Sequence, residues 1–422
     1  MPRSTFVLSL YAITLFCISL TPLHAKDTSL TRPSTVRESI GVNIHFTDPQ
    51  PGEMDMLEAA GFGWVRMDFA WGATEKTKGV YDFSHYDTLM SELKKHHMRA
   101  LLILDYGNDI YGAGGKPPYD DIGRAAFARW AVAAITHFRN RGVLWELWNE
   151  PNGDWFWPHH SADDYAKLLV TVGSAVKSAA PNELFIGPAM SGFDPNYLET
   201  CLKAGALNYW DAVSVHPYRQ NEPESAYLDY NNFKTLIARY APPGKTIPII
   251  SGEWGYSVSW GNYTDQRQGD YIVREFLSNI AYGIPLSIWY DWHDDGTDPK
   301  NAENNFGTVR YPYHSGQTPV YDPKPAYLAC KTLGQILGDF HFDGTETTDG
   351  KQTDHALRFA HNHDRRWAAW TSAPQPRDIT IPIPKGIYSL WNEQGQKRLS
   401  VTAGDRGLTI AVSGSPIYIE AN

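Results

Sequence analysis

Cysteine is scarce in this chain, and positive charge is not in excess. Three of the 422 residues are cysteines, Cys17, Cys201 and Cys330. Cysteines so widely separated form no metal-binding motif, and the sequence leaves open whether Cys201 and Cys330 pair. The formal net charge is −10, which disfavours nucleic acid or an anionic membrane surface as a partner, because both require a basic footprint.

Long apolar runs are also lacking after the first 25 residues. Arg3 precedes an apolar stretch from Phe6 to Leu20, and Leu23-His24-Ala25 ends in the small residue typical of a cleavage site. That stretch is too short to span a bilayer comfortably. We therefore expect residues 1–25 to be a signal peptide, with a retained membrane anchor as the alternative. The mature chain is then expected to be secreted or periplasmic, without an integral membrane segment.

From residue 40 to about 335, short β-like runs alternate with longer amphipathic stretches. The candidate strands are Ile40–His45, Trp64–Met67, Arg99–Asp105, Leu144–Asn149, Leu184–Gly187, Ala212–His216, Pro248–Ser251 and Leu286–Tyr290. The helical patterns include Arg124–Arg139, Ser161–Ala179 and Gln266–Tyr282. Apolar strands that are each followed by a helix indicate a parallel sheet covered on its outside. We predict an α/β fold, a (β/α)8 TIM barrel over residues 26–338. A doubly wound open sheet is the alternative, but no glycine-rich phosphate-binding fingerprint follows the first strand.

The pattern changes after residue 339. Short strand-like runs, among them Ala356–Ala360 and Trp367–Thr371, are separated by breakers such as Pro384-Lys385-Gly386. Two further runs are Ile379–Ile383 and Pro416–Ile419. Residues 339–422 are therefore predicted to form a small all-β, sandwich-like accessory domain that packs directly on the barrel.

Two glutamates stand where apolar runs end. Glu150 lies in Leu147-Trp148-Asn149-Glu150-Pro151, and Glu253 lies in Ser251-Gly252-Glu253-Trp254. In a barrel, residues at the C-terminal ends of strands meet at one face. A pair of carboxylates at that face is the minimum equipment for cleaving a glycosidic bond. Taken singly, Glu150 could be a loop or helix-start charge, and Glu253 could be the ion-pair partner of an arginine.

Other polar and aromatic residues also fall at strand ends. These candidate substrate-binding residues are Arg66, Asp105, Asn149, His216, Tyr218, Trp289 and Trp292. A buried guanidinium at Arg66 needs an acidic partner, and it would hold Glu253 ionised. His216 is alternatively a hydrogen-bonded histidine of the barrel interior.

Aromatic residues cluster in two apparent loops, Trp155–Trp157 and Trp289–Trp292. Their rings are expected to stack on the apolar faces of sugars, and Trp157 is included among the substrate-binding candidates; ordinary core packing is the alternative.

The acidic run from Asp291 to Asp298 superficially resembles a calcium loop. His293 stands at its third position and Ala302 where a bidentate glutamate belongs, so no metal is expected there. We expect its acidic residues to contact sugar hydroxyls instead.

The motif Trp148-Asn149-Glu150-Pro151, followed by a later strand-end glutamate, resembles clan A of the glycoside hydrolases. Within the clan the chain is most similar to family 39, particularly to secreted bacterial glycosidases associated with exopolysaccharides. The supporting runs are Gly41–His45, Val65–Phe69, Ser214–Tyr218, Gly252–Gly255 and Ile288–Trp292. The resemblance covers the whole presumed barrel, and a β-rich appendage also occurs in that family.

The resemblance implies a role for each site residue. Glu150 would be the general acid/base on the fourth strand and Glu253 the nucleophile on the seventh. Asn149 would bind the sugar 2-hydroxyl, Tyr218 would orient Glu253, and Arg66 would keep Glu253 charged. Glu150 should then have a raised pKa, so that it can donate a proton at neutral pH.

The expected function is that of a retaining glycoside hydrolase acting on a polysaccharide or oligosaccharide without a cofactor. The aromatic loops favour endo-acting cleavage. The alternatives are an exo-acting glycosidase of the β-xylosidase or arabinofuranosidase type, and a non-catalytic carbohydrate-binding barrel. The sugar, its linkage, the oligomeric state and the role of the β domain do not follow from the sequence.

Overall fold

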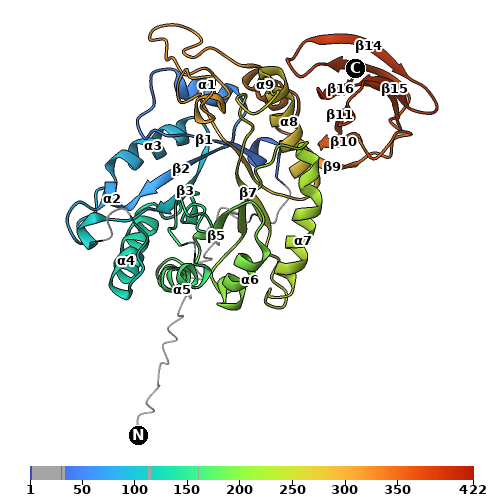
Figure 1. The fold of residues 1–422 in the computed structure, drawn as a ribbon. Coiled ribbons are helices and arrows are strands. Elements are labelled where there is room, and N and C mark those ends of the chain that lie inside the picture. Colours follow the sequence, from blue (N-terminus) through green and yellow to red (C-terminus); the bar gives the residue numbers. More distant parts are fainter. Residues whose placement is uncertain (2–29, 31–33, 113–115, 160) are drawn as a thin grey trace.

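The computed structural model describes residues 1, 30, 34–112, 116–159 and 161–422. The predicted signal peptide lies outside these described residues, apart from Met1. Figure 1 shows a barrel of strands surrounded by helices, with a separate β domain at the C-terminal end of the chain. Within the described parts of the chain, none of the helices combines the length and apolar character that a membrane crossing requires.

The barrel is a closed sheet of eight parallel strands in sequential order. They are β1 (Ile40–Asn43), β2 (Trp64–Ala70), β3 (Arg99–Asp105), β4 (Leu144–Leu147), β5 (Leu184–Ser191), β6 (Val213–His216), β7 (Ile249–Trp254) and β8 (Ser287–Trp289). Closure is made by β1 pairing with β8, with Gly41 opposite Ile288. The predicted (β/α)8 barrel is confirmed, because no open sheet edge remains within it.

The helices pack around the outside of the barrel (Figure 1). They are α1 (Glu53–Ala59), α2 (Trp71–Thr74), α3 (Ser84–Lys95), α4 (Asp121–His137), α5 (Ala162–Ala179), α6 (Pro195–Lys203), α7 (Tyr227–Ala238), α8 (Asp265–Ala281) and α9 (Pro325–Leu337). Local sequence explains where several begin. Ser161 caps α5 by accepting a hydrogen bond from the backbone N–H of Asp164, and Thr264 caps α8 in the same way through Arg267.

The C-terminal domain is antiparallel throughout. A six-stranded sheet has the order β14 (Lys397–Ala403), β13 (Gly386–Trp391), β16 (Ile417–Ala421), β11 (Asp364–Thr371), β10 (Asp354–His361) and β9 (His341–Thr345). A two-stranded sheet pairs β12 (Arg377–Ile381) with β15 (Leu408–Val412). Ile379 and Ile410 of the smaller sheet share a core with Trp367 and Ile419 of the larger one. The domain therefore has the two packed layers of a sandwich.

The β domain packs against the α8 and α9 side of the barrel (Figure 1). Trp370 of β11 is buried in the same apolar cluster as the barrel core, and its indole N–H donates to Glu224 at 2.6 Å. Arg274 of α8 also binds Glu224, at 2.8 Å.

Cys201 and Cys330 are both buried and free, so they do not form a disulfide.

Candidate active site

Glu150 and Glu253 meet at the end of the barrel where the strands finish. Glu253 lies within β7, and Glu150 follows β4 in a turn with unusual backbone conformation. Trp148 and Glu150 have φ values of 67° and 43°, in the left-handed region that non-glycine residues rarely occupy. The Glu150 backbone N–H donates to the carbonyl of Ala189 at 2.9 Å. Such strained backbone persists where the surroundings over-determine it, and it concentrates at functional sites.

Arg66 of β2 organises the site from below. Its side chain is 1% exposed. Its five N–H groups donate to Asn43, Glu146, Asn149, His216 and Glu253, at 2.6–3.3 Å. The shortest bond is to Glu253 at 2.6 Å. The guanidinium therefore has every donor occupied and holds both carboxylates of its ion pairs, Glu146 and Glu253, in fixed positions.

The protonation state of His216 follows from its two partners. Its Nε2 lies 3.3 Å from a guanidinium nitrogen of Arg66, which can only donate. Nε2 must therefore accept, so the ring proton of neutral His216 is on Nδ1. Nδ1 lies 2.9 Å from Oε1 of Glu150 and donates to it. Burial lowers the pKa of His216 to about 4, so that it stays neutral near pH 7. His216 therefore positions Glu150 through a hydrogen bond and, being neutral, does not form an ion pair with it.

The two glutamates have different surroundings. Oε1 of Glu253 accepts from the Tyr218 hydroxyl at 2.8 Å, and its Oε2 is paired with Arg66. Among the described residues, the ion-pair contact of Glu150 is His216, whose imidazole is neutral, and no lysine or arginine lies within ion-pair distance of it. Burial raises the pKa of Glu150, against smaller lowering effects from Ser191 and Arg66. One carboxylate is therefore paired with a cation, while the other is tuned by burial to carry a proton.

The separation of the two carboxylates is short. Oxygens of Glu150 and Glu253 lie within 4.8 Å of one another. Retaining glycosidases place these groups about 5–5.5 Å apart, whereas inverting enzymes need about 6.5–9.5 Å to admit a water molecule.

Asn149 completes this part of the site. Its Oδ1 accepts from Arg66 at 2.8 Å, which leaves its amide N–H groups available to a ligand.

Four of the predicted substrate-binding residues, Asp105, Trp157, Trp289 and Trp292, are 0–1% exposed. Unlike the equally buried Arg66 and His216, none of the four hydrogen-bonds to Glu150 or Glu253 among the described residues, so their expected contact with a sugar at the surface is not supported. The ring of Trp157 packs against Trp148 at 5.1 Å, beneath the Glu150 turn. Core packing, the alternative interpretation, holds for these three tryptophans. Trp155, in contrast, is 94% exposed.

Asp105 is buried without a hydrogen-bond partner among the described residues. Burial raises its pKa well above the ordinary value, and the neighbouring carboxylate of Asp68 adds to the effect. The carboxyl group is therefore enclosed in the barrel interior. Its position at the end of a predicted strand placed Asp105 at the right end of the barrel but could not give its depth.

Glu146 and Asn43 belong to the site, although neither was predicted from the sequence. Both side chains accept hydrogen bonds from Arg66. Glu146 offered a signal, because it interrupts the apolar run Leu144–Leu147 and a charge within a buried strand requires a partner. Asn43 gave no comparable signal, since a polar residue at a strand end is common.

The fold and this site define a class of protein. A closed (β/α)8 barrel with a carboxylate pair after β4 and within β7, one held by an arginine and a tyrosine, is the arrangement of clan A glycoside hydrolases. The sequence model of the family Cellulase (glycosyl hydrolase family 5) matches residues 30–296. The chain belongs to this family.

Individual relatives agree with that membership. The chain is similar to a β-xylosidase from Geobacillus stearothermophilus, with 26% identity over 298 residues, which cover 62% of this chain and 57% of the relative. The chain thus spans well under two thirds of that relative's length.

Solved structures extend the likeness to the β domain. A family 39 glycoside hydrolase from Bacteroides cellulosilyticus superposes with a TM-score of 0.77 at 25% identity, covering 93% of this chain and 82% of that one. A family 39 β-xylosidase from Caulobacter crescentus has a TM-score of 0.67 at 17% identity, with 93% and 98% covered, and shows the shared fold.

Proposed function

We propose that this protein is a retaining glycoside hydrolase that works by double displacement. The observation that carries the proposal is the asymmetry of the pair: Glu253 is bound by Arg66 and Tyr218, whereas Glu150 is buried beside a neutral imidazole with a raised pKa. In the first step Glu150 protonates the glycosidic oxygen while Glu253 attacks the anomeric carbon, so that the glycosidic bond breaks, the leaving group departs as an alcohol, and a glycosyl ester forms on Glu253. In the second step Glu150 takes a proton from water, which attacks the same carbon and releases Glu253.

We propose an exo-acting β-glycosidase, with β-xylosides as the first substrates to test. Two curated relatives, from Geobacillus stearothermophilus and Caldicellulosiruptor saccharolyticus, are named β-xylosidases. Endo-acting cleavage, the sequence-based expectation, relied on two aromatic loops. Three tryptophans of those loops are buried, which removes most of that support.

Endo-acting cleavage of a polysaccharide is the second candidate, and one observation favours it. Trp155 is 94% exposed, five residues after Glu150, and exposed tryptophans commonly stack on sugars. Export to the periplasm or the medium remains part of the proposal on the strength of the leader-like residues 1–25.

Separate alanine variants test the catalytic assignment. Glu150→Ala and Glu253→Ala should each lower kcat/KM by about 10³-fold or more, while Asp55→Ala, at an exposed position of α1, should keep wild-type rates. Azide should restore turnover to Glu253→Ala and yield a glycosyl azide of inverted configuration. A non-catalytic carbohydrate-binding barrel would instead show no hydrolysis in the wild type and unchanged sugar binding in all three variants.

Product analysis separates the two modes of cleavage. Chromatography of a xylo-oligosaccharide digest should show xylose as the first and major product. Early release of a ladder of longer oligosaccharides would overturn the exo assignment. Loss of that ladder in Trp155→Ala would then identify Trp155 as a binding platform for the polymer.

A further inference from the structure

The hydrogen bond between Tyr218 and Glu253 joins two separate parts of the chain. Glu253 lies within β7, while Tyr218 follows β6 in the loop that leads to α7. The backbone N–H of Tyr218 donates to the carbonyl of His216 at 2.8 Å, so the loop turns sharply where β6 ends. The 2.8 Å bond from the Tyr218 hydroxyl to Oε1 of Glu253 therefore depends on how this loop is held against β7.

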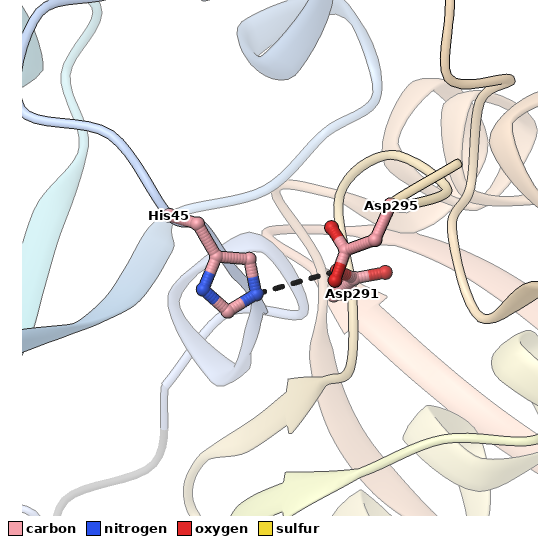
Figure 2. Close-up of side chains that lie close together, drawn as sticks. All are labelled: His45, Asp291 and Asp295. Atoms are coloured by element: carbon pink, nitrogen blue, oxygen red, sulfur yellow. Dashed lines mark ion pairs between the residues drawn. The ribbon is translucent and has the colours of Figure 1, made fainter. Parts of the chain in front are cut away.

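At another junction of this end of the barrel, a charged pair bridges neighbouring strand ends. His45 follows β1 and Asp291 follows β8, and Nε2 of His45 lies 3.4 Å from Oδ2 of Asp291 (Figure 2). This pair joins the two strands that close the barrel. At the junction of β6 and β7, a different cation has contacts on both sides. It is Arg219, which directly follows Tyr218.

Arg219 holds the loop that carries Tyr218. Its side chain is 14% exposed. Its Nε donates to the carbonyl of Pro217 at 3.0 Å, one residue before Tyr218. Its two terminal nitrogens donate to Ser225 at 3.2 Å and to Asp229 of α7 at 3.1 Å. The guanidinium therefore ties the backbone beside Tyr218 to the start of α7.

The same guanidinium also contacts β7. Its central carbon lies 5.5 Å from the ring centroid of Trp254, the residue that directly follows Glu253. A cation within about 6 Å of an aromatic ring is attracted to the face of that ring. The Trp254 side chain is fully buried, so it offers a fixed surface. Arg219 thus touches the residue before Tyr218 and the residue after Glu253.

We infer that Arg219 is a positioning residue that sets the distance between the Tyr218 hydroxyl and Glu253. This inference rests on the proposed function, in which Glu253 is the nucleophile and must be held in a fixed geometry to attack. A planar guanidinium can bond acceptors along its edge while its face lies on a ring, which a lysine ammonium cannot do. Without the guanidinium, the loop loses its tie to β7, and the Tyr218 hydroxyl moves away from Glu253.

Crystal structures of variants test this geometry without reference to activity. Arg219→Met keeps the apolar length of the side chain but removes the guanidinium. The separation between the Tyr218 and Glu253 oxygens should open from 2.8 Å to beyond about 3.5 Å. Arg219→Lys should show the same displacement, because one ammonium cannot replace the fork and the ring contact together. Arg239→Met, at an exposed position after α7, is the matched control and should keep the wild-type separation.

The kinetics of a double variant separate a positioning role from a general effect on folding. Tyr218→Phe removes the hydroxyl and should lower kcat by about 10–100-fold. Arg219→Met should lower kcat by about tenfold and change KM by less than about threefold. If Arg219 acts through Tyr218, the double variant should have the kcat of Tyr218→Phe alone, whereas independent roles would multiply the two losses.

Two results would overturn the inference. One is a Tyr218–Glu253 bond that keeps its wild-type length in both Arg219 variants. The other is a double variant whose loss of kcat equals the product of the single losses. A wild type that hydrolyses no glycoside would refute the proposed function instead, and the crystal structures would still decide whether Arg219 positions Tyr218.

Discussion

At the scale of single residues, Arg66 decides how the site is built. All five of its donors are used, and two of the acceptors are the carboxylates Glu146 and Glu253. A buried guanidinium is always charged and can only donate, so it forms the ion pair with Glu253 and also dictates the tautomer of His216. The orientation of Glu150 follows from that tautomer through the Nδ1–H bond. The charge of Arg66 therefore determines the ion pair of Glu253 and, through His216, the orientation of Glu150.

Replacing Arg66 with lysine tests that dependence. Arg66→Lys keeps the charge but offers three donors in place of five, which leaves buried acceptors unsatisfied. We expect the free energy of unfolding to fall by about 3 kcal/mol and kcat/KM to fall by about 100-fold. Urea titration and steady-state kinetics measure both. Arg398→Lys, exposed on β14, is the control and should stay within about 0.5 kcal/mol of the wild type. Wild-type values for Arg66→Lys would contradict this account.

The raised pKa of Glu150 predicts the shape of the pH profile. Glu150 must be protonated to act, so kcat/KM should fall as pH rises through its pKa. Glu150→Gln should remove this alkaline limb when assayed with an aryl glycoside whose leaving group needs no proton. His216 has a pKa of about 4 and stays neutral over the same range. An unchanged alkaline limb in Glu150→Gln would assign the limb to another group.

At the scale of elements, β4 and β7 deliver their glutamates by different means. Glu150 depends on a left-handed turn, while Glu253 sits on a strand that approaches its neighbours closely. A Cβ atom on Gly252 would lie 2.2 Å from Oγ of Ser214 and 3.1 Å from Oε1 of Glu146. A side chain at this position therefore lacks space, since a contact under 3 Å forces either the strand or the buried Ser214 side chain to shift.

Gly252→Ala should accordingly displace Glu253. We expect a loss of about 1–3 kcal/mol in the free energy of unfolding, together with a fall in kcat larger than the change in KM. Gly404→Ala, where an added Cβ meets nothing within 4 Å, is the matched control and should leave both quantities unaltered. Thermal denaturation and kinetics of the two variants make the comparison. Equal behaviour of the two would show that β7 tolerates the shift.

Much of the element pattern was predictable because it depends on local chemistry. Ser161 marked the start of α5, and β3 was predicted with its observed bounds, Arg99–Asp105. Strand ends near the site were less accurate: β4 stops at Leu147, before Asn149, because the left-handed turn begins there. Side-chain depth was not predictable. Trp289 and Trp292 stand at a strand end like Tyr218, yet long-range packing buries them.

At the scale of the whole molecule, the barrel and the β domain share a core. Trp370, Phe359 and Tyr418 of the β domain belong to the apolar cluster that also fills the space between barrel and helices. Glu224 accepts from Trp370 and pairs with Arg274, which is 3% exposed. An apolar interface with buried ion pairs predicts that the two parts unfold together.

Trp370→Ala tests that coupling. Removing this buried ring should lower the free energy of unfolding by about 3–5 kcal/mol and should shift a single calorimetric transition. Trp155→Ala removes a ring of the same size that is 94% exposed, and it should change stability by less than about 0.5 kcal/mol. Two resolved transitions, with only one moved by Trp370→Ala, would instead make the β domain an independent unit.

The central claim is that Glu253 attacks the sugar, and covalent trapping tests it most directly. A 2-deoxy-2-fluoro β-glycoside of the hydrolysed sugar, with a dinitrophenolate leaving group, forms the glycosyl-enzyme and slows its hydrolysis. Intact mass followed by peptide mapping should find one fluoroglycosyl ester, located on Glu253. An ester on Glu150, or no adduct together with direct release of the inverted sugar, would contradict the account.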